Sequence, residues 1–387
     1  MYKGYKVIDA DSHTMEPLSL WDDYLDPKYR PYAPGGSKKP LGAAKRDLTI
    51  DGFGAPRPDG SVSPPYISDG EGGLLTWKEA YKTYQDQGFS AKSYIQYMDQ
   101  SGIDLMVLYP TDALGLTAVD TGQGRQIMNP RVAENLYIAY NNWLYDFCNQ
   151  GEGRLFGAGG VDLRDADAAA REARRCVKEL GMKALYILPQ PSLGIPLHDD
   201  YYDVLWAEIA DLGVPMGIHG LQGSSSVGKD YWGNTFDMGR AATSFPMEEM
   251  MACVSLTGGG VLERFPDMKV VFLESSAGWA PFWLWWCDDK WKQRSVTGRT
   301  TTTKEMPSYY FKRQCWISGE PEEPGYAYCV QWGLEDNIAT STDFPHPEDI
   351  NFPRAMDDFF DYQSTVLTEE QIRKCLWDNP AKLYSIA

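Results

Sequence analysis

The chain has 387 residues and 43% of them are hydrophobic, which allows a large core and excludes a disordered chain. The formal net charge of −18 argues against partners such as nucleic acids and anionic membranes, because both are negatively charged. The start of the chain has no signal-peptide pattern and no run is long enough to span a membrane, so we expect a cytoplasmic protein. Seven cysteines without a Cys-x-x-Cys pair argue against a disulfide framework and a zinc ribbon.

Short apolar runs alternate with longer helical patterns, which is typical of βα units around a parallel sheet. Helices are clearest at Ala133–Cys148, Asp165–Leu180 and Tyr201–Leu212, and the last two are each followed by a glycine. The sequence predicts eight strands, at Lys6–Asp9, Leu105–Tyr109, Leu155–Gly159, Ala184–Ile187, Val214–His219, Lys269–Leu273, Cys315–Ser318 and Asn337–Thr342.

Eight parallel strands with helices between them close into a barrel, so we expect an α/β protein: a (β/α)₈ TIM barrel forming one domain over residues 1–387. The rival is a doubly wound sheet, which usually has fewer strands and a glycine-rich phosphate-binding turn after the first one. Here the first strand is followed by DADSHTMEP, which contains no such turn.

Two segments interrupt the pattern on the expected catalytic face. Residues 34–75 are dominated by Gly, Pro, Ser and Lys, and they form either an inserted lid over the barrel mouth or a solvated loop. Residues 220–245 follow the fifth strand and are predicted to form a second long, glycine-rich loop.

A carboxylate and an imidazole follow the first strand, at Asp11 and His13. Residues two apart in extended chain point to the same side, so this pair can hold one cation. By itself the Asp-x-His pattern is weak, and a turn-capping Asp beside a buried, hydrogen-bonded His is the better explanation of the motif taken alone.

His219 ends the fifth strand and Asp343 ends the eighth. The carboxyl ends of barrel strands meet at the catalytic face, so both side chains point toward Asp11 and His13. Two His and two carboxylates suit zinc, manganese or iron better than calcium, which prefers oxygen ligands. The sequence therefore predicts a metal site at Asp11, His13, His219 and Asp343.

Three further residues are candidates with less defined roles. Glu274 closes the sixth strand and is a possible fifth ligand, an acid–base group or a partner of a backbone amide. His346 lies between two prolines, and we favour a role in structure or in supporting a ligand. His198 lies in the loop after the fourth strand, either in contact with substrate or on the surface.

These residues lie in segments that resemble the amidohydrolase-related family typified by aminocarboxymuconate semialdehyde decarboxylase and the resorcylate and carboxyvanillate decarboxylases. The resemblance runs the length of the chain, and the order of its segments makes it specific. The segments are VIDADSHTMEPLSLWDDYL, MDQSGIDLMVLYPT, AYNNWLYDFC with RLFGAGGVDL, LWAEIADLGVPMGIHG, RFPDMKVVFLESSAGWAPFW, STDFPHPE and DNPAKLY.

The resemblance implies one divalent metal, Zn or Mn, with ligands at Asp11, His13, His219 and Asp343. The family often has His where this chain has Asp11, although decarboxylating relatives often have Glu there. Binuclear relatives use a carboxylated Lys at the end of strand four, where this chain has YILPQ, so we expect a single ion. Relatives are often homodimers, and we expect the same here.

Many relatives carry His on strand six, so Glu274 leaves the reaction open. We favour hydrolysis of a small aromatic or cyclic substrate by metal-activated water, with Asp343 or Glu274 as the base and His219 as a ligand. The reason is that an additional carboxylate can act as a base near a metal-bound water, whereas beside an anionic substrate it would be unfavourable. The alternative is non-oxidative decarboxylation of a hydroxylated aromatic acid, with Asp343 protonating the ring carbon. A third hypothesis, a catalytically silent binding barrel, fits less well with intact ligands.

Overall fold

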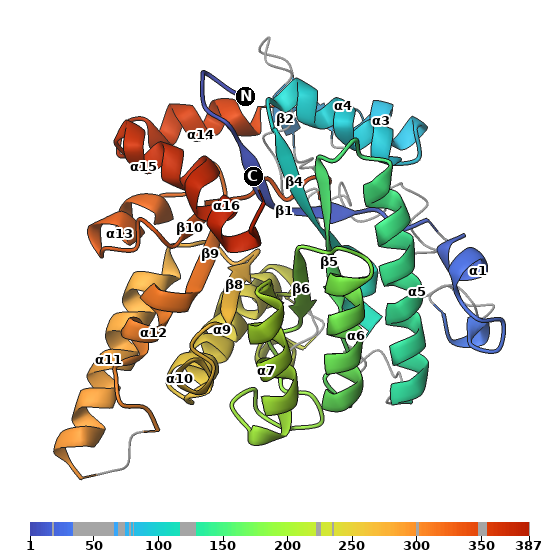
Figure 1. Cartoon of the computed structure of the whole chain (residues 1–387). Helices are drawn as coiled ribbons and strands as arrows, with labels where there is room; N and C mark the ends of the chain where they lie inside the picture. Colours follow the sequence, from blue (N-terminus) through green and yellow to red (C-terminus); the bar gives the residue numbers. More distant parts are fainter. Residues whose placement is uncertain are drawn as a thin grey trace.

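Eight parallel strands form one sheet in the order β1-β4-β5-β6-β7-β8-β9-β10, and Figure 1 shows it at the centre of the molecule with helices around it. This is a computed structural model, which describes residues 1–17, 19–33, 66–68, 74–76, 79, 81–116, 129–221, 226–233, 236–298, 302–346 and 354–386. The arrangement is the predicted (β/α)₈ TIM barrel. The strands are β1 Ile8–Thr14, β4 Leu105–Pro110, β5 Leu155–Gly160, β6 Ala184–Ile187, β7 Pro215–His219, β8 Lys269–Leu273, β9 Cys315–Gly319 and β10 Ile338–Thr340.

All eight predicted strands are present, and β6 and β8 have the predicted bounds. The largest difference is in β1, which continues to Thr14 instead of ending at Asp9. Its register against β4 shifts between Asp9 and Ser12, so Asp11 lies inside an irregular stretch of the strand and His13 lies in the regularly paired stretch that follows. An irregularity of this kind re-aims side chains locally, which is common beside functional sites.

The barrel closes through main-chain hydrogen bonds between β1 and the segment after β10. The Asp343 N–H donates to the Asp11 carbonyl over 3.0 Å, and the His13 N–H donates to the Phe344 carbonyl over 2.6 Å. We call this pair of contacts the closing seam. It brings three of the predicted ligands side by side, although the chain separates Asp343 from Asp11 by more than three hundred residues.

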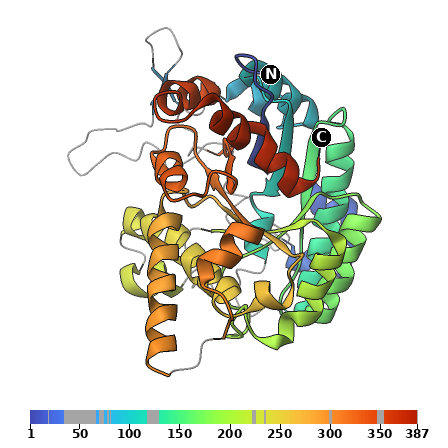
Figure 2. The ribbon, with the colours of Figure 1, turned by 60° about the vertical axis from the view of Figure 1, so that its left-hand side comes forward.

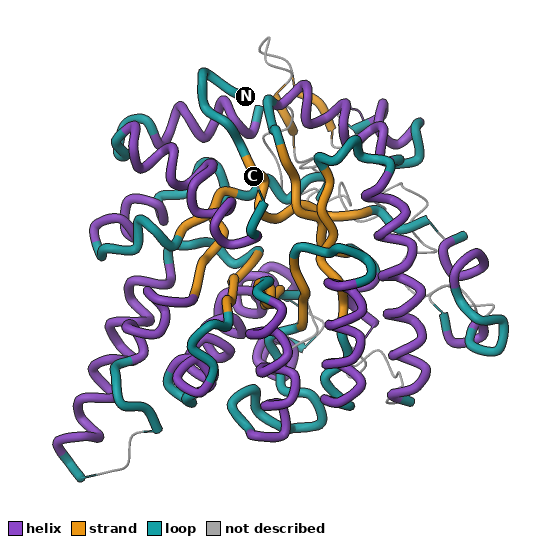
Figure 3. Tube along the Cα trace, in the orientation of Figure 1, coloured by secondary structure: helices purple, strands orange, loops and turns teal. Residues whose placement is uncertain are grey.

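Helices cover the outside of the sheet, so Figure 3 shows the strands enclosed by helical segments. Local chemistry explains several of their ends. The Asp165 side chain accepts the Ala168 N–H over 2.9 Å and starts α6, whereas α7 ends at Gly213, whose φ of +70° suits a residue without Cβ. The helices are α1 Leu20–Tyr24, α3 Lys82–Asp86, α4 Ala91–Ser101, α5 Pro130–Asn149, α6 Ala166–Lys178, α7 Asp203–Leu212, α8 Ser226–Trp232, α9 Asp237–Thr257, α10 Val261–Arg264, α11 Trp279–Val296, α12 Pro307–Gln314, α13 Gly325–Gln331, α14 Ala355–Gln363, α15 Glu369–Arg373 and α16 Asn379–Tyr384.

The prediction of a loop over residues 220–245 is wrong in large part, because α8 and the start of α9 occupy it. Glycine and serine suggested a loop, but aromatic packing stabilises helix there. The rings of Trp232 and Phe236 lie 5.2 Å apart and enclose Gly239, where a Cβ would clash with the Phe236 ring. Tertiary contacts therefore outweigh local propensity.

The predicted insertion at 34–75 lies mostly outside the described residues. Its described parts are β2 Tyr66–Ser68 and β3 Leu74–Thr76, which pair antiparallel. A role as a lid stays a prediction. No helix in the described part of the chain is both long and apolar enough to cross a bilayer.

Candidate metal centre

The imidazole of His13 lies at the centre of a cluster of acidic and histidine side chains. Its Nε2 is 3.0 Å from Asp343 Oδ1 and 3.8 Å from Asp11 Oδ1. The ring nitrogens His13 Nε2 and His219 Nε2 are 3.2 Å apart, and His219 Nε2 is 3.7 Å from Asp11 Oδ1. The predicted ligands thus gather around His13 in two overlapping groups, one with Asp11 and His219 and the other with Asp343.

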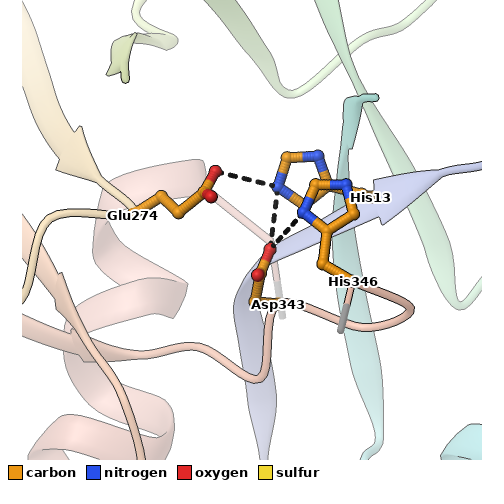
Figure 4. A group of neighbouring side chains, drawn as sticks. All are labelled: His13, Glu274, Asp343 and His346. Atoms are coloured by element: carbon orange, nitrogen blue, oxygen red, sulfur yellow. Dashed lines mark ion pairs between the residues drawn. The ribbon is translucent and has the colours of Figure 1, made fainter. Parts of the chain in front are cut away.

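Glu274 and His346 join the same cluster. Glu274 Oε2 is 3.2 Å from His219 Nε2 and 3.7 Å from His13 Nε2. His346 Nδ1 is 3.0 Å from Asp343 Oδ1, and its ring stacks on that of His13 with centroids 3.9 Å apart. Figure 4 shows these side chains converging from β1, from the loop after β8 and from the loop after β10.

Burial divides the cluster into two layers. Asp11, His13 and His219 form a floor whose side chains are almost inaccessible to solvent. The other three side chains form a rim and are 10–14% exposed; they are Glu274, Asp343 and His346. A substrate entering the barrel mouth would therefore meet the rim, above a floor that only a small ion or water can reach.

The cluster fits a divalent ion. Donor atoms about 2.1 Å from one ion stand about 3.0–3.4 Å apart, close to the shorter separations measured here. Asp11 Oδ1 and both carboxylate oxygens of Asp343 are among the buried side-chain atoms of the described residues that have no hydrogen-bond partner. Buried carboxylate oxygens require compensation, and a cation provides it.

Burial also sets the protonation of the cluster. It lowers the pKa of His219 to about 3, so this imidazole is neutral and can ligate a metal. Burial raises the pKa of Asp343 well above its usual range, and burial with the charge of Asp343 does the same for Asp11. Carboxyls that resist ionisation when no cation is present would release protons on metal binding.

Comparison with known proteins gives the family. The family model for amidohydrolases matches residues 8–386, nearly the whole chain. The chain belongs to the amidohydrolase family. It is therefore an enzyme, either a metal-dependent hydrolase or a related carboxy-lyase. The hypothesis of a catalytically silent binding barrel receives no support.

Two curated relatives are equally identical to this amidohydrolase but cover different shares of its length. A gamma-resorcylate decarboxylase from Polaromonas sp. is 24% identical over 298 residues, which cover 76% of this chain and 86% of the relative. A 2-amino-3-carboxymuconate-6-semialdehyde decarboxylase from Dictyostelium discoideum is 24% identical over 259 residues, which cover 65% of this chain and 66% of the relative.

Solved structures agree on the fold of this amidohydrolase. An amidohydrolase from Mycobacterium avium subsp. paratuberculosis is 20% identical and superposes with a TM-score of 0.74 over 98% of both chains. A 5-carboxyvanillate decarboxylase from Novosphingobium aromaticivorans, complexed with manganese and 4-hydroxy-3-methoxy-5-nitrobenzoic acid, is 20% identical, with a TM-score of 0.68 over 99% of this chain and 97% of that chain.

In this amidohydrolase, main-chain carbonyls orient the two floor imidazoles. His13 Nδ1 lies 2.7 Å from the Pro110 carbonyl, and His219 Nδ1 lies 2.7 Å from the Gly220 carbonyl. A carbonyl accepts only, so each Nδ1 carries the hydrogen and each Nε2 keeps its lone pair for the cluster. The strand ends therefore fix the tautomers as well as the positions of these ligands.

The sequence analysis assigned no role to Asp9, whose side chain stabilises the closing seam. Its fully buried carboxylate accepts the Thr342 N–H over 3.1 Å, the Thr342 hydroxyl over 2.5 Å and the Ser12 hydroxyl over 2.7 Å. Burial raises the pKa of Asp9 to about 6. A carboxylate at the end of the predicted first strand was the available signal, but its partner Thr342 lies at the other end of the chain.

A second missed network orients His346. The Thr111 hydroxyl lies 2.8 Å from His346 Nε2, and Glu16 accepts the N–H groups of Thr111 and Asp112 over 3.1 Å each. His346 thus has Asp343 on one ring nitrogen and Thr111 on the other. This arrangement places His346 on the rim beside Asp343, and its role in supporting a ligand stays a prediction.

His198 does not join the cluster. It lies on the exposed surface, where Nδ1 is 2.9 Å from the Ser255 hydroxyl of α9. The surface alternative from the sequence analysis describes it, and contact with substrate receives no support from its position.

Proposed function

We propose that this amidohydrolase is a manganese-dependent decarboxylase that removes CO₂ from a small hydroxylated aromatic acid. The cluster around His13 supports a metal-dependent reaction. The names of the relatives support decarboxylation, because they include a gamma-resorcylate decarboxylase and a 2-amino-3-carboxymuconate-6-semialdehyde decarboxylase. They favour the alternative from the sequence analysis over hydrolysis, which was our main prediction.

The metal would be held by Asp11, His13, His219 and Asp343, with Glu274 within reach. Manganese is bound in the solved 5-carboxyvanillate decarboxylase, and three carboxylates around the site give the oxygen-rich donor set that suits Mn²⁺ better than a thiolate-preferring ion. When bound, the ion would supply positive charge that holds the substrate carboxylate and a neighbouring hydroxyl.

Asp343 is the residue placed to deliver the proton. Its carboxyl lies on the rim, where a proton that it carried would be beside a substrate entering the barrel mouth. The proton leaves Asp343 to form the new C–H bond on the ring. The C–C bond to the carboxylate breaks, its electron pair stays on the ring, and CO₂ departs.

His346 would restore the proton to Asp343. Its Nδ1 lies 3.0 Å from Asp343 Oδ1, and Thr111 occupies its other ring nitrogen. An imidazole between a carboxyl and a hydroxyl can pass a proton while it keeps its orientation. Glu274 faces His219 from the opposite side of the rim, where it would complete the donor set.

Metal content and CO₂ release test the proposal together. Protein purified without chelator should hold about one equivalent of Mn²⁺ or Zn²⁺, and Mn²⁺ should support release of CO₂ from 2,6-dihydroxybenzoate or 5-carboxyvanillate. His219→Ala and Asp343→Asn should lose both properties, with a fall in rate of about 10²–10⁴-fold or more for Asp343→Asn.

The matched control is His198→Ala, because His198 is an exposed histidine outside the cluster. It should keep the parental metal content and rate. Hydrolysis of lactone or ester substrates by the metal-loaded protein, without CO₂ release from any hydroxybenzoate, would overturn decarboxylation in favour of hydrolysis.

We also infer a homodimer, supported by the outer face of α11. Phe282, Trp285 and Trp286 are exposed there, and α11 packs on α9 through the hydrogen bond from the Trp283 indole to the Met250 carbonyl. Figure 2 shows α11 on the outside of the barrel. Exposed aromatic side chains in a row are typical of protein interfaces. Sedimentation velocity of the purified chain tests this assembly.

A further inference from the structure

A buried glutamate outside the metal cluster reaches the loop that carries Glu274. Glu323 lies between β9 and α13, and it is 8% exposed. Its Oε1 accepts the N–H of Ala277 over 2.7 Å. Ala277 belongs to the turn that follows Glu274, so a side chain from one βα loop supports the backbone of the neighbouring loop.

The surroundings of Glu323 are shaped to hold its carboxyl in place. A Cβ on Gly325 would come within 2.4 Å of Oε1, and a Cβ on Gly319 within 3.1 Å. Gln363 of α14 donates from Nε2 to the carbonyls of Pro321 and Glu323, over 2.8 and 3.0 Å, which fixes the backbone on both sides. The carboxyl therefore occupies a niche that glycines leave open.

The loop after β8 needs such support. Glu274 has a φ of +49° and Ser276 a φ of +60°, both in the left-handed region that non-glycine residues rarely adopt. The Glu274 N–H donates to the Ser318 hydroxyl over 3.3 Å, and the next backbone contact with β9 and its loop is the one that Glu323 makes. A strained backbone persists where surrounding groups hold it.

We propose that Glu323 is a positioning residue for Glu274: by accepting the Ala277 N–H it holds the left-handed turn that presents the Glu274 carboxylate to the metal cluster. Among the described residues, Glu323 forms no hydrogen bond or ion pair with a side chain of the cluster, so it would act through Glu274. This role rests on the proposed function, since it requires that Glu274 contributes to the binding of a divalent ion.

The protonation of Glu323 makes the role specific. Burial raises the pKa of Glu323 to about 8, so the carboxyl is mostly neutral near pH 7 and acts as a hydrogen-bond acceptor rather than as a charge. Glutamine has the same shape and the same acceptor. Glu323→Gln should therefore preserve the turn, whereas Glu323→Ala removes the acceptor and leaves the Ala277 N–H buried.

Calorimetric titration with Mn²⁺ of metal-free protein separates positioning from general stability. The variants are Glu323→Ala, Glu323→Gln, Glu274→Gln and the double variant of Glu323→Ala with Glu274→Gln. The matched control is Asp288→Ala: Asp288 lies on α11 and is also 8% exposed, and its carboxylate accepts the N–H and hydroxyl of Ser308 on α12. Hydrogen exchange over residues 274–278 reports on the turn without metal.

Glu323→Ala and Glu274→Gln should each weaken Mn²⁺ binding about 10–100-fold, as loss of a group that supports a ligand does. The double variant should bind no more weakly than the worse single variant, because both changes act through the same carboxylate. Glu323→Gln and Asp288→Ala should stay within about threefold of the parent chain, although Asp288→Ala loses stability. Exchange over 274–278 should accelerate in the two proteins that carry Glu323→Ala, the single and the double variant, and stay at the parental rate in the others.

Parental Mn²⁺ affinity in Glu323→Ala, losses that add in the double variant, or unchanged exchange over 274–278 would each overturn the role of Glu323. A parent chain that binds Mn²⁺ but decarboxylates no hydroxybenzoate would overturn the proposed reaction and leave the role of Glu323 standing. A parent chain that binds no Mn²⁺ would overturn both.

Discussion

The two sides of the metal cluster are built differently. On one side, main-chain hydrogen bonds of the closing seam hold Asp11, His13 and Asp343 in place. On the other, Glu274 lies beyond the end of β8, in a left-handed turn held by side chains of Ser318 and Glu323. Backbone pairing gives a rigid position that tolerates changes in nearby side chains. A turn held by side chains depends on each of them, so single substitutions should disturb it selectively.

The seam side also depends on the buried side chain of Asp9, and the largest expected effect of the comparison comes from removing it. Asp9→Ala leaves the N–H and hydroxyl of Thr342 and the hydroxyl of Ser12 without their buried acceptor. Each unpaired donor costs about 1–3 kcal/mol. We expect a loss of several kcal/mol in urea unfolding, with Mn²⁺ binding weakened about 10–100-fold.

Asp9→Asn is the control for this change, because an amide keeps one acceptor and should recover part of both losses. If Asp9→Ala unfolds at the parental urea concentration and binds Mn²⁺ as tightly as the parent, the main-chain bonds alone hold the seam. The seam side would then depend on side chains even less than the structure indicates, and its contrast with the turn that carries Glu274 would be stronger.

This contrast also explains what the sequence could predict. The eight strands, and with them Asp11, His13, His219 and Asp343, follow from apolar runs that end in polar residues, since a parallel barrel brings strand ends to one face. Position along a strand is local information, so these residues were accessible to prediction.

The supporting residues were not accessible in this way. Asp9 is hydrogen-bonded to Thr342 at the other end of the chain. Glu323, after β9, is hydrogen-bonded to Ala277, which lies after the neighbouring strand β8. Their roles depend on which loops become neighbours and on the glycines that make room, neither of which leaves a periodic signal. His346 had a local signal in the STDFPHP motif, but its partner Thr111 did not.

A smaller effect should appear in the pH dependence of stability, on the turn side. The pKa of Glu323 rises from 4.5 in the unfolded chain to about 8 in the folded protein because of burial. The native state therefore binds the proton more tightly. Its contribution to stability is full below about pH 4.5 and is lost as the pH rises to about 8, at about 1.4 kcal/mol per pH unit.

Glu323→Gln has no proton to lose, so its urea stability relative to the parent chain should increase from pH 6 to pH 8. The difference between the two proteins removes the contributions of other titrating groups, including Glu320 and Glu322, whose charges also raise the pKa of Glu323. A difference that stays constant over this range would mean that Glu323 is already ionised at pH 6, and the turn would then be held by a charge.

The smallest effect concerns Thr111, which orients His346 from the seam side without contacting any proposed ligand. Thr111→Val removes one hydrogen bond worth about 0.5–1.5 kcal/mol, so we expect kcat for CO₂ release to fall about 3–10-fold while KM stays near the parental value. Thr111→Ser keeps the hydroxyl and should restore the rate. The matched control is Thr257→Val on α9, which removes a buried hydroxyl bonded to the Cys253 carbonyl. An increase in KM with unchanged kcat would instead mean that His346 contributes to substrate binding. The rim would then act by binding the substrate rather than by transferring a proton.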